Sequence, residues 1–240
     1  MSKFIAVCGS PESGKTVTAL KLAQEIYEIT KKRVLFFSPD LSVPLMRYIF
    51  PHCKESDLYS VGEVLDRTDI YKEDLLKRIV TVKTMMNFGF LGYKAGENKY
   101  TYPRPTEDKI RQLFLCLRDT AEYIIFDCVS DSADLLSAMA KAEADKLIKV
   151  TSPDLKCITY FSSNSEQFSA LDERTVAVMN IKEKDMYLPT EETLAHFKNI
   201  QFILPYSYAL KKQTYTGTLS ERLNDKKYES VINKIAKAVI

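Results

Sequence analysis

The chain has 240 residues, of which 45% are hydrophobic and 28% charged, and its formal net charge at pH 7 is +2. This is the composition of a globular protein long enough to bury a substantial core, and the near balance of charge argues against a protein that coats polyanions. No apolar run approaches the roughly 20 residues of a membrane-spanning helix, and the amino-terminal residues lack the apolar region of a signal peptide. We therefore expect a cytoplasmic protein without a transmembrane segment.

Strand-like and helix-like segments alternate at the start of the chain. The apolar run 3–7 predicts a strand, the helical spacing of apolar residues over 16–29 predicts a helix, and 33–37 predicts a second strand. Residues 41–105 are less regular. Short helices are expected within 57–67 and 72–83, and a strand followed by a long loop over 87–105.

The second half of the chain continues the alternation. Helices are expected over 106–120, 132–142, 154–170, 190–198 and 227–240, and strands over 122–127, 146–152, 174–180 and, with its following loop, 200–207. Strands that alternate with helices indicate a parallel sheet. We therefore predict a three-layer α/β fold, with a mostly parallel twisted sheet covered by helices on both faces, and a single domain over 1–240.

The cysteines do not indicate a disulfide framework or a zinc site. Their number is odd and no two of them form a C-x-x-C pair, so reduced thiols that pack as small hydrophobic side chains are expected. With two histidines in the chain, a histidine-rich metal site is not expected either. The cysteines are Cys8, Cys53, Cys116, Cys128 and Cys157.

Residues 8–26 read CGSPESGKTVTALKLAQEI and contain the pattern G-x-x-x-x-G-K-T from Gly9 to Thr16. Glycines allow backbone N–H groups to curve around phosphate oxygens, and the positive end of the following helix adds to the attraction. A lysine such as Lys15 supplies charge to the outer phosphates, and a hydroxyl such as that of Thr16 is a ligand for Mg²⁺. An ordinary turn is the alternative, but the strand before the loop and the long helix after it favour nucleotide binding.

Two aspartates follow predicted strands. Asp127 ends the strand 122–127, and Asp40 follows the strand 33–37. Both are expected at the carboxyl edge of the sheet, where ligands of parallel sheets collect. Phosphoryl-transfer sites need an acidic group for the metal and a group that places the attacking water, although an aspartate at a strand end is also a common turn residue.

The order of these segments resembles the ParA/MinD family of P-loop ATPases over nearly the whole chain. The second-strand segment KRVLFFSPDLS, the segment from EYIIFD to TSPDLKCI, the strand VAVMN and the late segment FILPYSYALKKQTYTG carry the resemblance. It implies binding of ATP or ADP with Mg²⁺, and formation of a homodimer.

The resemblance also implies roles for individual residues. Asp40 would orient the hydrolytic water, and Asp127, like Asp40 and Thr16, belongs to the magnesium site. Catalysis would then rest on Lys15, Asp40 and Asp127. The residues implied to hold the phosphates are Gly9, Ser10, Pro11, Glu12, Ser13, Gly14, Lys15, Thr16 and Val17, and those implied to lie near adenine are Asn180 and, in a loop that closes over the nucleoside, Pro205, Tyr206 and Ser207.

The chain departs from the family pattern at several positions. Ser10 stands where the family has a second lysine that reaches the partner's phosphates across an ATP-sandwiched dimer. Pro11 and Glu12 replace small glycines, and the Glu12 carboxylate disfavours phosphate unless it points outward. Ser38 replaces one of two acids, and 128–131 lack the glycine of the family's switch. Loss of a charge near the transferring phosphoryl group slows the reaction by orders of magnitude, so ATP binding with weak or slow hydrolysis is expected.

These departures resemble those of the CpaE/TadZ-like branch, which is associated with pilus assembly and secretion. The leading interpretation is an ATP-dependent positioning or assembly factor with a cell-envelope or partition-system partner. A DNA-partitioning ATPase is the second, with the basic runs 31–33, 211–212 and 226–227 as candidate contacts. A small-molecule kinase is the third, with Arg104, Arg111 and Arg118 as loose candidates for a lid.

Two further segments leave alternatives open. The terminal helix 227–240 has an apolar stripe and several lysines, which suits either a helix docked on the core or one lying on anionic lipid; a docked helix is favoured. The tyrosines of 93–105 could mark a partner surface or pack their loop onto its own domain, and the second is slightly favoured.

Overall fold

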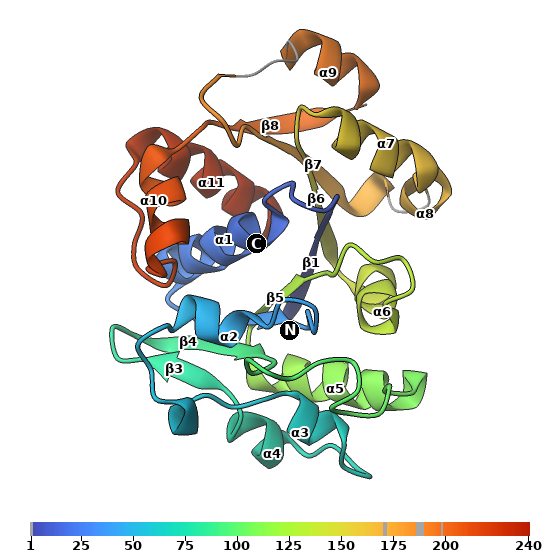
Figure 1. Cartoon of the computed structure of the whole chain (residues 1–240), viewed down its shortest axis with the longest axis vertical. Coiled ribbons are helices and arrows are strands. Elements are labelled where there is room, and N and C mark those ends of the chain that lie inside the picture. The colour runs from blue at the N-terminus through green and yellow to red at the C-terminus, as the bar shows by residue number, and fades with distance from the viewer. Residues whose placement is uncertain (1, 170–171, 186–189, 198) are drawn as a thin grey trace.

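The computed structural model describes residues 2–169, 172–185, 190–197 and 199–240. Its strands are β1 (Lys3–Gly9), β2 (Val34–Ser38), β3 (Val80–Val82), β4 (Met85–Gly92), β5 (Tyr123–Asp127), β6 (Lys146–Thr151), β7 (Thr175–Asn180) and β8 (Ile200–Leu204). They form one eight-stranded sheet in the order β3-β4-β2-β5-β1-β6-β7-β8 (Figure 1). All neighbouring strands are parallel except β3, which pairs with β4 in the antiparallel direction.

Helices cover both faces of this sheet. They are α1 (Lys15–Thr30), α2 (Leu45–Ile49), α3 (Gly62–Leu65), α4 (Lys72–Leu76), α5 (Glu107–Thr120), α6 (Leu135–Glu143), α7 (Leu155–Ser163), α8 (Ser165–Ser169), α9 (Thr190–His196), α10 (Tyr208–Thr216) and α11 (Lys226–Val239). Helices α1, α10 and α11 lie on one face, and α5, α6 and α7 on the other (Figure 1). The predicted three-layer α/β fold is confirmed.

The central strand β1 shows why both faces need cover. Ile5 and Val7 are buried in the core beneath α1 and α11, whereas Phe4 and Ala6 are buried in the core beneath α5 and α6. Successive side chains of a strand point to opposite faces, so a strand that is apolar at every position must be covered on both sides.

The parallel arrangement brings distant residues to one edge of the sheet. Strand β1 lies between β5 and β6, and β2 pairs with β5 on the side away from β1. The carboxyl ends of β1, β2, β5 and β7 are Gly9, Ser38, Asp127 and Asn180. The loop between β1 and α1 therefore leaves the sheet beside the end of β5, and the ends of β2 and β7 lie one strand further away on either side.

Three predicted segments differ in the structure. Part of the segment 72–83, expected as a helix, forms the edge strand β3, where Val80 faces the core. The strand and loop expected over 200–207 are followed directly by helix α10, for which no helix was predicted. The expected helix 154–170 is divided into α7 and α8, and its last residue, like 198 of the helix expected over 190–198, lies outside the described residues.

The last helix docks on the core. Ile232, Ile235 and Val239 of α11 are buried in the cluster that contains α1 and the sheet. Its apolar stripe is thus covered by protein, as expected for a docked helix. Within the described residues, no helix is both long enough and apolar enough to cross a bilayer.

The connection after β4 packs onto its own domain through two of its tyrosines. Tyr93 is buried and its ring lies 6.3 Å from that of Tyr102, which in turn covers Gly62. Tyr100, by contrast, is 84% exposed. Tyr93 and Tyr102 therefore hold the loop in place, as expected.

A substitution in β4 tests how tightly the core is packed next to β2. Phe90 is fully buried, and its ring lies 4.8 Å from those of Phe50 and Phe88. We expect Phe90→Ala to lower the free energy of unfolding by about 3–5 kcal/mol. Met86→Ala on the same strand is the control, because Met86 is 84% exposed. Equal effects of the two substitutions in urea denaturation would contradict the assigned strand register.

Candidate phosphate-binding site

Two glycines of the loop between β1 and α1 occupy positions that exclude side chains. A Cβ atom on Gly9 would lie 2.6 Å from Ser13 Oγ and 2.7 Å from the carbonyl oxygen of Val150. Gly14 has φ +81°, and a Cβ atom on it would lie 2.3 Å from Asn180 Nδ2. Only glycine fits at these two positions, and the loop between them makes a tight turn.

Three side chains, from the connection after β5 and from the end of β7, bind carbonyl oxygens of this loop. Ser130 Oγ donates to Gly9 O at 2.8 Å, and Asn180 Nδ2 donates to Ser13 O at 2.9 Å. Lys182 Nζ donates to Glu12 O at 2.9 Å. With its carbonyls held by the protein, the loop can offer N–H groups, and the first turn of α1 adds N–H groups that have no partner within the helix. This arrangement suits an anion.

Asp127 is buried beside the start of α1. Its Oδ2 accepts a hydrogen bond from Ser38 Oγ at 3.1 Å, while its Oδ1 has no hydrogen-bond partner among the described residues. Burial raises the pKa of Asp127 to about 6, although the Lys15 ammonium and the Thr16 hydroxyl lie close enough to lower it in part. A buried carboxylate with one unpartnered oxygen fits a metal ion or a water bound to one.

Asp40 lies at the same edge of the sheet. Its Oδ1 accepts hydrogen bonds from the N–H groups of Ser42 and Val43, at 2.8 and 3.0 Å, and so fixes the turn after β2. Its charge is close enough to raise the pKa of Asp127. The structure therefore brings together Lys15, Thr16, Asp40 and Asp127, as the sequence predicts.

Of the loop residues that depart from the family pattern, two are exposed and one is buried. The Glu12 carboxylate is exposed and pairs with Lys156 Nζ at 2.9 Å, so it points outward. Pro11 is also exposed. Ser10 is fully buried beside Cys157; burial raises the pKa of that thiol, and the Ser10 hydroxyl offsets this in part. The side chain at position 10 is therefore directed into the protein.

The residues expected near adenine lie at the end of β7 and directly after β8. Asn180 ends β7 and uses its amide group to hold the loop. Ser207 is buried and caps α10, where its Oγ accepts from Leu210 N at 3.2 Å, and Pro205 and Tyr206 are half-buried. Their contact with a base remains a prediction.

Sequence reasoning missed four residues of the site. Ser38 was read only as a lost acid, yet its hydroxyl binds Asp127. Ser130, Lys156 and Lys182 bind the loop or its side chain from segments 121 to 170 residues away. The position of Ser130 three residues after the Asp127 strand end was the one available signal.

The basic residues considered for DNA or for a kinase lid are exposed or paired. Lys31 pairs with Glu28 at 2.5 Å and Arg33 with Glu122 at 3.0 Å. The α5 residues Arg111 and Arg118 pair with nearby acids. The remaining lysines of the basic runs, at 32, 211, 212, 226 and 227, are exposed.

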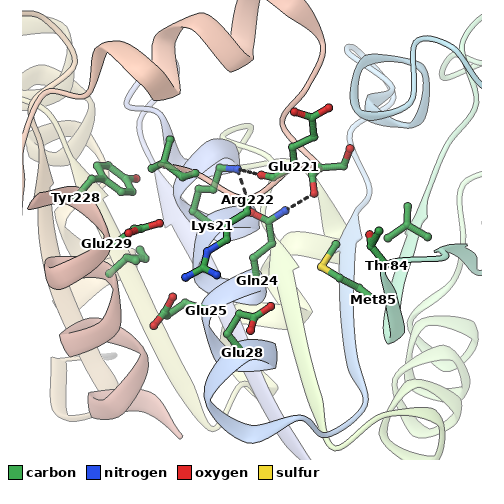
Figure 2. Close-up of a pocket in the computed structure, with 14 residues that line it drawn as sticks. Lys21, Gln24, Glu25, Glu28, Thr84, Met85, Glu221, Arg222, Tyr228 and Glu229 are labelled. Carbon is green, nitrogen blue, oxygen red and sulfur yellow. Dashed lines mark hydrogen bonds between the residues drawn. The ribbon is translucent and has the colours of Figure 1, made fainter. Parts of the chain in front are cut away.

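A separate cavity of about 450 Å³ lies along α1, beyond its first turn (Figure 2). It is lined by α1, by residues near β3 and β4, by 220–223 and by α11. At its upper end in this view, Lys21 Nζ donates to the carbonyls of Leu219 and Glu221 at 2.8 and 2.9 Å, and Gln24 Nε2 donates to that of Ser220 at 2.9 Å. These bonds tie the connection between α10 and α11 to the helix that begins at the phosphate loop.

The buried Lys21 predicts a pH dependence of stability. Burial lowers the pKa of Lys21 to about 7, from 10.5. Between these values the unfolded chain binds a proton that the folded chain does not, so the free energy of unfolding rises with pH. Relative to Lys21→Met, the wild-type protein should gain about 1.5 kcal/mol between pH 7 and 8.5 in urea denaturation. An unchanged difference between the two proteins across this range would contradict the prediction.

The buried Asp127 predicts the opposite slope at lower pH. Because its folded-state pKa is raised from 3.8 to about 6, the folded chain binds more protons between these values, and stability falls as pH rises through them. With EDTA and no nucleotide, Asp127→Asn should therefore be more stable than wild type at pH 7 by about 1–3 kcal/mol. The difference should shrink at pH 4. A variant that is less stable than wild type at pH 7 would show that the carboxylate stabilises the empty site.

No family model and no curated protein matches the sequence. Solved structures do match. A ParA family ATPase from Chlorobium tepidum is 14% identical with a TM-score of 0.77, over 98% of both chains. The septum site-determining protein MinD from Pyrococcus horikoshii, solved with Mg-ADP, is 18% identical with a TM-score of 0.73, over 100% of this chain and 96% of its own.

A third structure is a plasmid partition protein from Borrelia burgdorferi bound to AMPPNP. It is 15% identical with a TM-score of 0.74, and the match covers 100% of both chains. At these identities the comparison concerns the fold. The chain has the α/β fold of the ParA and MinD ATPases, with the glycine-rich loop after its central first strand.

Proposed function

We propose that this protein binds ATP with Mg²⁺ in the loop between β1 and α1 and acts as a nucleotide-dependent positioning or assembly factor. The observation that carries the proposal is the loop itself. Its carbonyls are held by Ser130, Asn180 and Lys182, and it lies beside the buried Asp127, which has an unpartnered oxygen.

Each residue of the site has a role in this proposal. Lys15 neutralises the outer phosphates, and Thr16 and Asp127 hold the magnesium ion directly or through its waters. Asp40 orients the attacking water. The bound ion would add positive charge to the phosphates during transfer. Catalysis then rests on Lys15, Asp40 and Asp127.

Slow hydrolysis follows from the charge of the site. A second cation on the transferring phosphoryl group is worth orders of magnitude in rate. Ser10 occupies the position from which the family's second lysine would act, and its side chain is buried. The protein would then hold ATP for long periods, which suits a switch better than a fast enzyme.

The proposed role in positioning is supported by the solved structures of like fold, which include a septum site-determining protein and a plasmid partition protein. We propose a homodimer whose formation depends on ATP. Its partner would be a cell-envelope machine of the pilus or secretion type, or a component of a partition system.

Lys15→Ala tests nucleotide binding directly. By calorimetry, the wild-type protein should bind ATP in the presence of Mg²⁺, and Lys15→Ala should bind at least about tenfold more weakly, because a charge-assisted contact to phosphate is lost. Lys212→Met is the control, since this lysine lies exposed on α10. Sedimentation should show an ATP-dependent dimer for wild type and for the control.

Two results would contradict the proposal. If the folded wild-type protein does not bind ATP, the proposed nucleotide site is wrong. If dimers form equally with and without ATP, and equally with Lys15→Ala, dimerisation does not depend on the nucleotide. The proposed switch would then be wrong, while nucleotide binding could still hold.

A further inference from the structure

Glu12 occupies an unusual place in the phosphate loop. Its φ is +61°, a left-handed conformation that favours glycine. Its carboxylate pairs with Lys156 Nζ at 2.9 Å, and its carbonyl oxygen accepts from Lys182 Nζ at 2.9 Å. Two lysines from elsewhere in the chain therefore bind one loop residue, one at the side chain and one at the main chain.

Lys182 is itself anchored. Its Nζ also lies 3.1 Å from Asp154 Oδ2. Asp154 caps α7 by accepting from Cys157 N at 2.8 Å, and it accepts from Ser152 Oγ at 2.6 Å. The lysine thus links the segment after β7, the start of α7 and the tip of the phosphate loop, and its side chain is 33% exposed.

The cluster contains the carboxylate of Glu12 and two lysines that offset its negative charge. Lys156 lowers the pKa of Glu12, so the carboxylate is ionised at neutral pH. An unpaired carboxylate in a loop that binds phosphates would repel them. Lys156 and Lys182 place two positive charges beside it, and Asp154, which pairs with Lys182, offsets part of this effect.

We propose that Lys156 and Lys182 are positioning residues for the triphosphate, and that both act through Glu12. Lys182 holds the main chain of the loop in the left-handed turn that a non-glycine residue resists. Lys156 neutralises the carboxylate and keeps it directed away from the loop. The inference rests on the proposed function, because it concerns the affinity of the same loop for ATP.

Double-mutant cycles on ATP affinity test this dependence. In calorimetry, Lys156→Met should weaken ATP binding roughly two- to fivefold, as expected for an exposed ion pair. In a Glu12→Gln background the same substitution should have no effect, since no charge is left to neutralise.

Lys182→Met should weaken binding about tenfold, because a charged hydrogen bond is lost. The loss should be smaller in a Glu12→Gly background, where the turn no longer needs to be enforced. Lys182→Arg should recover most of the affinity. Lys212→Met is again the control, and thermal unfolding of each variant separates loss of binding from loss of folding.

Three outcomes would overturn the inference. The lysine substitutions could leave ATP binding unchanged. They could weaken it by the same factor whatever stands at position 12, which would mean that the lysines contact the nucleotide directly. Lys182→Met could lower the thermal midpoint and ATP affinity together, with no recovery by Lys182→Arg. Failure of the proposed function is distinguishable, because wild type itself would then not bind ATP.

Discussion

The site depends on the fixed direction of a few main-chain carbonyls. Ser130, in the connection after β5, and Asn180 and Lys182, at and just after the end of β7, bind the carbonyls of the glycine-rich loop at the carboxyl edge of the sheet. Each bond turns a peptide unit so that its oxygen faces protein. The loop proposed to bind phosphates is therefore held in shape by the fold, so that on this proposal the cost of ordering the loop is met during folding rather than during binding.

The buried carboxylate behind the loop illustrates how function and stability oppose each other. Asp127 is placed by a strand whose other residues are apolar, and its ionised form is disfavoured by burial. Ser38 and the Lys15 ammonium offset only part of this. The cost of this residue in the empty protein supports the proposal that it serves a cation.

Local patterns in the sequence were sufficient for the loop, for the two aspartates and for the alternation of strands and helices. They failed where the partner lies far away along the chain: no spacing rule connects Lys182 with Glu12. The edge strand β3 was read as part of a helix because its few apolar residues continue the run of α4. Helix α10 was not predicted, although Ser207 supplies an ordinary N-cap, because the segment 202–217 was matched through the family resemblance to a loop that closes over the nucleoside.

The burial of Ser10 bears on how the proposed site could acquire faster hydrolysis. The Ser10 side chain is fully buried and lies beside Cys157. A long basic side chain introduced there would have to lose its hydration inside the protein or force the first turn of the loop to rebuild. In the proposed site, a second cation would therefore be supplied at lower cost by a different element or by another molecule than by replacement of Ser10.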